Sequence, residues 1–170
     1  MIKAREASDR LGATKMDRPE WIAVDPVARW VYCALTNNSA RGQPGQPGVD
    51  AANPRAGNTM GGILRWQEDD DFDAETFAWT HFVLAGDPAN ERAEAQGNVK
   101  GDAFACPDGL RVDARGVLWI DTDIGSGALG RGEMARLGNN AMLASDPATG
   151  EVRRLDRKST RLNSSDTDIS

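Results

Sequence analysis

Arg18 and Glu20 are the residues whose types and spacing best suit chemistry, because they flank Pro19 just before an apolar run. Side chains two residues apart on an extended segment point to the same face. An arginine in that position can hold an anionic group through two parallel hydrogen bonds, and the neighbouring carboxylate can bind a hard cation. The pair therefore predicts one arm of a polar site at the start of a β-strand.

The same arrangement occurs again at Asp108, which follows Pro107 and also precedes an apolar run. Residues 19–25 align with residues 107–113 without a gap, and both segments end in aspartate. Repeated strand–turn–strand units of this kind are typical of a β-propeller, in which four-stranded blades surround a channel. We therefore expect an all-β fold, a partial β-propeller of about three to four blades, with the starts of its inner strands meeting at a shared polar centre.

A short helix and a series of β-hairpins must position these residues. The pattern of apolar residues, broken by Gly, Pro and Asp, predicts a helix over 4–11 and strands over 21–24, 29–35, 62–67, 77–84, 109–112, 117–121, 140–145 and 151–155. Residues 37–60 form a long connection, and loops of this length are usually functional or mobile. This loop carries polar residues that we treat as possible ligands: Asp50, Asn53, Arg55 and Asn58.

The bulk composition, with 39% hydrophobic and 27% charged residues in a chain of 170, indicates one soluble globular domain over residues 1–155. The net charge of −6 argues against a nucleic-acid partner, because binding to a phosphate backbone needs clustered Lys and Arg. No apolar run is long enough for a membrane helix. The first residues do not read as a signal peptide, so we expect the targeting segment of an exported parent to lie upstream.

The two cysteines are too few for a disulfide framework and are not spaced as a metal clip. Cys33 lies inside an apolar run, which predicts a buried core residue. Cys106 directly precedes Pro107 and Asp108, and two readings stay open for it: a neutral substitution, or a thiol that approaches a metal site.

A family resemblance is carried by residues 12–21, 35–39, 50–55, 82–88, 107–110, 118–123 and 138–143. In these strings, and in their order over most of residues 2–155, the sequence resembles the PhoX family of alkaline phosphatases. The resemblance implies a six-bladed propeller with an iron–calcium cluster (Fe3+ and Ca2+) in its channel. It also implies a calcium-dependent enzyme, secreted or periplasmic and monomeric at full length, that hydrolyses small-molecule phosphate monoesters.

The resemblance implies that Arg18 binds substrate and that Glu20 binds the metal cluster, so we expect both to be catalytic. Arg55 is a second candidate for a phosphate contact. Asp108 is the equivalent carboxylate of the second repeat, although a Pro-Asp-Gly sequence is often only a turn. The predicted metal ligands are carboxylates and amide oxygens of the kind that calcium prefers: Glu20, Asp108, Asp121, Asp123, Asn37 and Asn38.

The family chain is several times longer than this one, and its N-terminal half supplies part of the cluster, including a cysteine ligand to iron. Neither Cys33 nor Cys106 matches that cysteine, so we expect a fragment that is inactive alone. Residues 156–165 have the sequence obtained by translating a standard short-read sequencing adapter, which predicts that residues 156–170 are a non-native, disordered tail. A natural disordered tail rich in Ser, Asp and Asn is the alternative.

Two other functions remain compatible with the repeats. A propeller with a metal in its channel can instead hydrolyse a lactone or another ester with the help of calcium, and Arg18 would then have no phosphate to hold. A binding propeller without catalysis is the other alternative, in which Glu20 and Asp108 only cap strands.

Overall fold

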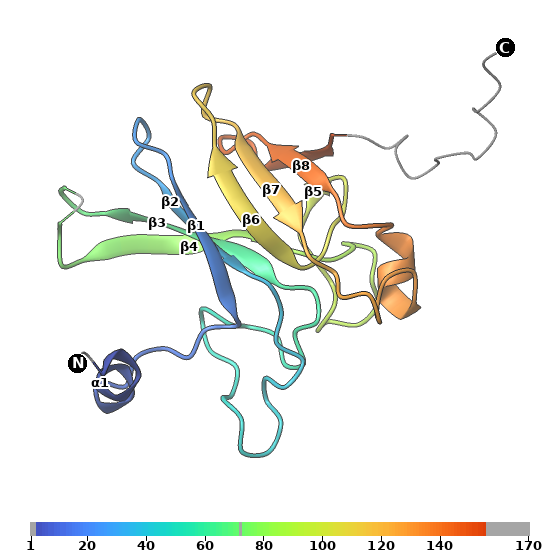
Figure 1. The fold of residues 1–170 in the computed structure, drawn as a ribbon, viewed down its shortest axis with the longest axis horizontal. Helices are drawn as coiled ribbons and strands as arrows, with labels where there is room; N and C mark the ends of the chain where they lie inside the picture. Colours follow the sequence, from blue (N-terminus) through green and yellow to red (C-terminus); the bar gives the residue numbers. More distant parts are fainter. Residues whose placement is uncertain (1–2, 72, 156–170) are drawn as a thin grey trace, which may run out of the picture.

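The computed structural model describes residues 3–71 and 73–155, which form two β-sheets (Figure 1). The first sheet, here called blade 1, joins in chain order β1 (Pro19–Val24), β2 (Val31–Leu35), β3 (Gly62–Glu68) and β4 (Phe77–Leu84). The second sheet, blade 2, has the order β5-β9-β8-β7-β6 and consists of β5 (Lys100–Gly101), β6 (Pro107–Val112), β7 (Leu118–Thr122), β8 (Met142–Ser145) and β9 (Glu151–Arg154).

Helical structure is limited to short elements outside the sheets. The helix expected over 4–11 is present as α1 (Ala4–Arg10), and a 3-10 helix, η1 (Gly132–Arg136), precedes β8. In the described part of the chain, no helix is both long and apolar enough to cross a membrane. The predicted adapter-derived tail, residues 156–170, lies outside the described residues.

The all-β class and the partial propeller are confirmed, but the described residues form two blades rather than the expected three to four. The difference arises because the hairpin made by β8 and β9 is not a separate blade. It pairs with the preceding hairpin through β7 and β8, from Leu118↔Ser145 to Asp121↔Met142. Alternation along the sequence reveals strands, but it does not reveal which hairpins share a sheet.

The two blades pack face to face around one apolar core. Blade 1 contributes Tyr32, Ile63 and Val83, and blade 2 contributes side chains such as Leu118 and Leu143, all of them buried. Cys33 points to the opposite face of blade 1, as the two-residue period of a strand requires, and is buried there as predicted.

The inner strands of both blades have the same irregular pairing, which confirms the repeat seen in the sequence. In β1 the pair Pro19↔Leu35 is followed by a register shift, and β6 repeats this after Pro107↔Thr122. Each strand also ends in an aspartate that closes the turn. The Asp25 carboxylate accepts hydrogen bonds from two backbone N–H groups of its turn, and the Asp113 carboxylate does the same.

The face of blade 1 that points away from blade 2 is apolar and open. The pairing register places Val24, Val31, Trp66 and Trp79 in one row across the sheet. Ile22, on the edge strand β1, is 60% exposed, and Val24 and Trp79 are exposed as well. Exposed apolar surface of this kind beside a strand with unpaired backbone groups favours association.

We therefore expect residues 1–155, expressed alone, to self-associate. The variant with Ile22→Lys and Val24→Lys should associate less, because one charge then lies in the apolar row at Val24 and a second lies beside the row at Ile22. Val27→Lys is the matched control, since Val27 is an exposed valine in the turn beyond β1 and lies outside the row. Light scattering after size-exclusion chromatography measures the effect. A monomeric wild-type chain with a cooperative melt would contradict this expectation.

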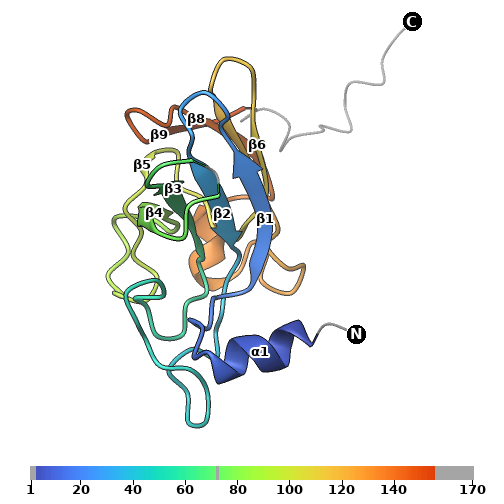
Figure 2. The same cartoon turned by 90° about the vertical axis from the view of Figure 1, so that its left-hand side faces the viewer.

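The long loop between β2 and β3, expected to be functional or mobile, is held by a buried polar network. It lies at the same end of the molecule as α1 and as the start of β1 (Figures 1 and 2). Side chains of Arg41, Asn53 and Asn58 are buried within it. The loop therefore serves as a structured support beneath the start of β1.

Candidate active site at the start of the inner strands

The site is formed where β1 and β6 begin, since these two inner strands lie side by side. Each strand is preceded by a residue with a left-handed backbone, Arg18 with φ +48° and Cys106 with φ +53°. This conformation before a proline is sparsely populated and costs about 1–3 kcal/mol for a residue other than glycine. Backbone hydrogen bonds hold both residues: the Arg18 carbonyl accepts from Thr36 at 3.2 Å and the Cys106 carbonyl accepts from Asp123 at 2.8 Å.

The predicted carboxylates gather at this point. Partial burial raises the pKa of Asp108, and the negative charges of Glu20, Asp123 and Asp121 raise this pKa further, whereas the nearby Arg18 lowers it. Glu20, Asp121, Asp123 and Arg18 therefore all lie close enough to Asp108 to act on its carboxylate. Concentrated negative charge of this kind favours a bound cation.

Asp121 reaches the cluster because its neighbour on β6 is a glycine. A Cβ atom at Gly109 would lie 3.0 Å from a carboxylate oxygen of Asp121, which is tighter than an ordinary contact. The Pro-Asp-Gly sequence therefore does more than make a turn: its glycine leaves room for the carboxylate of the next strand.

The guanidinium of Arg18 lies over the cluster and is open to solvent. Its side chain is 57% exposed; Nη1 donates to Asn37 Oδ1 at 3.2 Å, and Nη2 lies 3.4 Å from Glu20 Oε1. Asn37 in turn donates through Nδ2 to the Cys106 sulfur at 3.4 Å. Asn37 thus links the starts of both inner strands. It is a hydrogen-bond partner of the Arg18 guanidinium as well as a predicted metal ligand.

A cavity of about 290 Å³ lies beside this cluster, with Asn37 and Cys106 on its wall. The Cys106 thiol is buried and donates to the Thr59 carbonyl at 3.5 Å. Burial raises the pKa of this thiol, which opposes formation of the thiolate that a metal would require. The Cys106 sulfur therefore lies buried between Asn37 Nδ2 and the Thr59 carbonyl, next to the predicted ligands.

Arg55 is not brought to the cluster as a phosphate contact. Its side chain is buried, the residue being 6% exposed, and it donates to the backbone carbonyls of Ala85, Gln96 and Gly61. Burial lowers the pKa of Arg55 to about 10. With its donors directed at carbonyl groups, Arg55 joins the long loop to the end of β4.

Asn38 is also placed elsewhere than predicted. Its Nδ2 donates to an oxygen of Asp17 at 2.9 Å, and its Oδ1 accepts from the backbone N–H of Ala40 at 3.1 Å. Both polar atoms are therefore engaged in supporting the loop, whereas the adjacent Asn37 faces the cluster. Neighbouring residues in a turn point in different directions, and the sequence does not reveal which of two asparagines faces a site.

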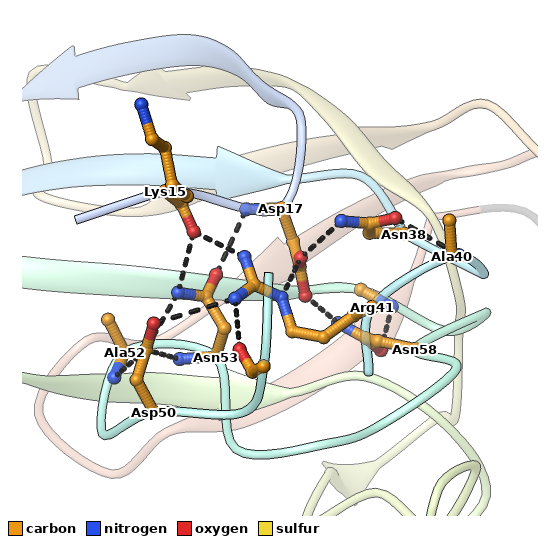
Figure 3. A network of polar contacts seen from close by, with 11 residues as sticks. Lys15, Asp17, Asn38, Ala40, Arg41, Asp50, Ala52, Asn53 and Asn58 are labelled. Carbon is orange, nitrogen blue, oxygen red and sulfur yellow. Dashed lines mark hydrogen bonds and ion pairs between the residues drawn. The ribbon is translucent and has the colours of Figure 1, made fainter. Parts of the chain in front are cut away.

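The buried network around Asp17 and Arg41 was not predicted at all (Figure 3). Both side chains are 0% exposed, and Arg41 Nε donates to Asp17 Oδ1 at 2.6 Å. Asn38 and Asn58 donate to the same carboxylate, and Asn53 accepts from the Asp17 backbone N–H at 2.9 Å. Asp17 directly precedes Arg18, so the network lies immediately beneath the candidate site. Asp17 and Arg41 are 24 residues apart in sequence, so no local sequence pattern predicts that they pair.

The donors in the cluster fit calcium in type but do not form a complete site. Carboxylate and amide oxygens are the ligands that calcium prefers. Among the described residues, no three Asp, Glu, His or Cys side chains are arranged so that they could hold a metal ion.

Comparison with known proteins shows the family of this chain. The family described as "Alkaline phosphatase PhoX" matches residues 1–164. A solved structure, "Pseudomonas fluorescens PhoX in complex with vanadate, a transition state analogue", is 48% identical with a TM-score of 0.79, and the match covers 89% of this chain. This chain spans 26% of the length of that protein. No curated protein matches the present chain. The extent of the family match and the identity over two packed blades establish that this chain belongs to the PhoX family of alkaline phosphatases.

Proposed function

We propose that this chain provides one arm of the active site of a metal-dependent phosphomonoesterase. The observation that carries the proposal is the guanidinium of Arg18, which is exposed, held by Asn37 and placed beside Glu20 and Asp108. The solved relative was captured in complex with vanadate, a transition state analogue. A site that binds such an oxyanion needs positive charge around it, and Arg18 is the cation of the described cluster.

Hydrolysis of a phosphate monoester develops negative charge on the non-bridging oxygens, and preorganised donors stabilise that charge. The fork of Arg18 can donate two parallel hydrogen bonds to two of these oxygens. Its contact with Glu20 is 3.4 Å long and partly exposed, so the phosphate can replace it at little cost. Asn37 would keep the guanidinium oriented while substrate binds.

Calcium is the metal that suits the donors of this chain. Glu20, Asp108, Asp121 and Asp123 would each supply part of its coordination, with Asn37 as a neutral oxygen ligand, and the rest of the full-length chain would complete the site. A bound cation polarises a phosphate oxygen and helps to generate a nucleophile from water. We propose that iron (Fe3+) accompanies calcium, as the resemblance to the family implies.

The remaining features of the proposal follow from charge and family. A net charge of −6 makes a nucleic acid an unfavourable partner, so we propose small-molecule phosphate monoesters as substrates. We also propose that the full-length protein acts as a monomer outside the cytoplasm, in the periplasm or after secretion.

The proposal is tested by assaying the full-length product of the gene on p-nitrophenyl phosphate and on a lactone. We expect phosphatase activity that is lost on chelation with EGTA and restored by calcium, and no lactonase activity. Lactone hydrolysis without phosphatase activity would overturn the proposal in favour of the calcium-dependent esterase. A protein that is inactive on both substrates in the presence of calcium would instead indicate a binding propeller.

A further inference from the structure

We propose that Asp17 and Arg41 are positioning residues for Arg18, acting through its left-handed backbone. This inference rests on the proposed function, because it concerns how the phosphate-binding arginine is held. Its basis is the buried network of Figure 3, which neither the sequence nor the family match assigns to catalysis.

The backbone of Arg18 needs an external support. A non-glycine residue with φ +48° before a proline persists only where its surroundings over-determine it. On its C-terminal side, Pro19 is paired with Leu35 in the sheet, and the Arg18 carbonyl accepts from Thr36. The N-terminal side lies outside any strand: the Arg18 N–H donates to the Met16 carbonyl at 3.1 Å, and the residue between them carries the remaining contacts.

Asp17 supplies these contacts through both oxygens of its carboxylate and through its backbone N–H. Its Oδ1 accepts from Arg41 Nε at 2.6 Å and its Oδ2 accepts from Asn58 Nδ2 at 3.0 Å. Its backbone N–H donates to Asn53 Oδ1 at 2.9 Å. Both the backbone and the side chain of Asp17 are therefore fixed, which leaves the next residue little freedom to rotate.

Arg41 ties this aspartate to the rest of the loop. Its Nη1 donates to the Gly48 carbonyl at 2.6 Å, and its Nη2 donates to the Lys15 carbonyl. The guanidinium thus bonds both to Asp17 and to the residue two positions before it. A planar fork with fixed donor directions suits this task better than a flexible ammonium group.

The network contacts the site at a second point. Asn38 donates to Asp17, and the adjacent Asn37 accepts from Arg18 Nη1 at 3.2 Å. Two members of the network are therefore direct neighbours in sequence of two members of the cluster. A shift of Asp17 would move the backbone of Arg18 and the partner of its guanidinium together.

A double-mutant cycle in the full-length gene product tests the inference, with inorganic phosphate as a competitive inhibitor. Asp17→Asn keeps the shape of the side chain and removes its charge. We expect it to raise the inhibition constant for phosphate by about tenfold or more, because a displacement of about 1 Å is costly in such sites. In an Arg18→Ala background the same change should add nothing, since the residue that Asp17 positions is already gone.

Asp25→Asn is the matched control. Asp25 is also buried and also accepts hydrogen bonds in a turn, but it lies at the opposite end of β1. It should change phosphate affinity less than about twofold, even where the loss of thermal stability equals that of Asp17→Asn. Should Asp17→Asn not fold, Asn58→Ala takes its place in the cycle: it removes the bond to Asp17 Oδ2 together with the bond that Asn58 Oδ1 accepts from the Gly61 backbone N–H.

The outcomes separate this inference from the proposed function. If Arg18→Ala weakens phosphate binding while Asp17→Asn does not, or if the two effects multiply in the double variant, the positioning role is overturned and the proposed function stands. If Arg18→Ala leaves phosphate affinity unchanged, the proposed role of Arg18 is itself overturned, and the positioning role with it.

Discussion

Replacement of Arg18 by alanine should lower kcat/KM for p-nitrophenyl phosphate by about 100- to 1,000-fold in the full-length protein, the usual cost of one lost donor to transition-state charge. The effect should be this large because the guanidinium is the cation next to Glu20 and Asp108, and its contacts leave it open to an incoming phosphate. Steady-state kinetics measure it. Arg18→Lys should recover only part of the loss, since an ammonium group retains the charge without the two-pronged geometry.

Arg115→Ala provides the control for this measurement. Arg115 is 76% exposed and pairs with Asp113 in the turn at the far end of β6. Its removal takes away an exposed arginine at the other end of the neighbouring inner strand without touching the cluster, so kcat/KM should stay within about twofold of wild type. Full phosphatase activity in Arg18→Ala would contradict the assignment of Arg18, whatever the behaviour of the control.

Replacement of Arg41 by alanine should lower the free energy of unfolding by about 3–5 kcal/mol, because it leaves the carboxylate of Asp17 buried without its cationic partner. Both side chains are 0% exposed, so water cannot take the place of the guanidinium without opening the loop. The loss should be visible as a lower urea midpoint and a lower melting temperature.

Two further variants of the same protein make this result specific. Arg153→Ala breaks the exposed pair with Glu151 and should cost at most about 1 kcal/mol. Combining Arg41→Met with Asp17→Asn should recover part of the loss, since a buried charge is no longer left alone. Equal stabilities for Arg41→Ala and Arg153→Ala would contradict the view that this ion pair supports the loop.

The hairpins could be predicted because their signals are local. The short apolar runs 21–24 and 31–35, and an aspartate such as Asp25 after a strand, act within a few residues of one another. The repeat of this pattern at 107–113 was enough to indicate a propeller. The number of blades was wrong because β7 and β8 pair across an interval of irregular chain, and such pairing leaves no periodic trace.

The candidate site was predicted unevenly for a similar reason. Arg18, Glu20 and Asp108 stand at the starts of two repeated strands, and the structure brings them together as expected. Arg55 and Asn38 belong to the long loop, where the direction of a side chain depends on contacts that local sequence does not encode. The polar side-chain atoms of Arg55 and Asn38 form hydrogen bonds within the protein.

By itself, the sequence determined the types of residue at the site and the strand starts that carry them, because strand periodicity and proline act locally. Only the tertiary structure decided which polar residues are exposed to a ligand and which are consumed in support. Asp17 and Arg18 illustrate the division: they are adjacent and oppositely charged, yet one is buried against Arg41 and the other faces solvent. Burial is a property of the packed loop as a whole. It separates polar residues of similar type into those that face the site and those that support it from beneath.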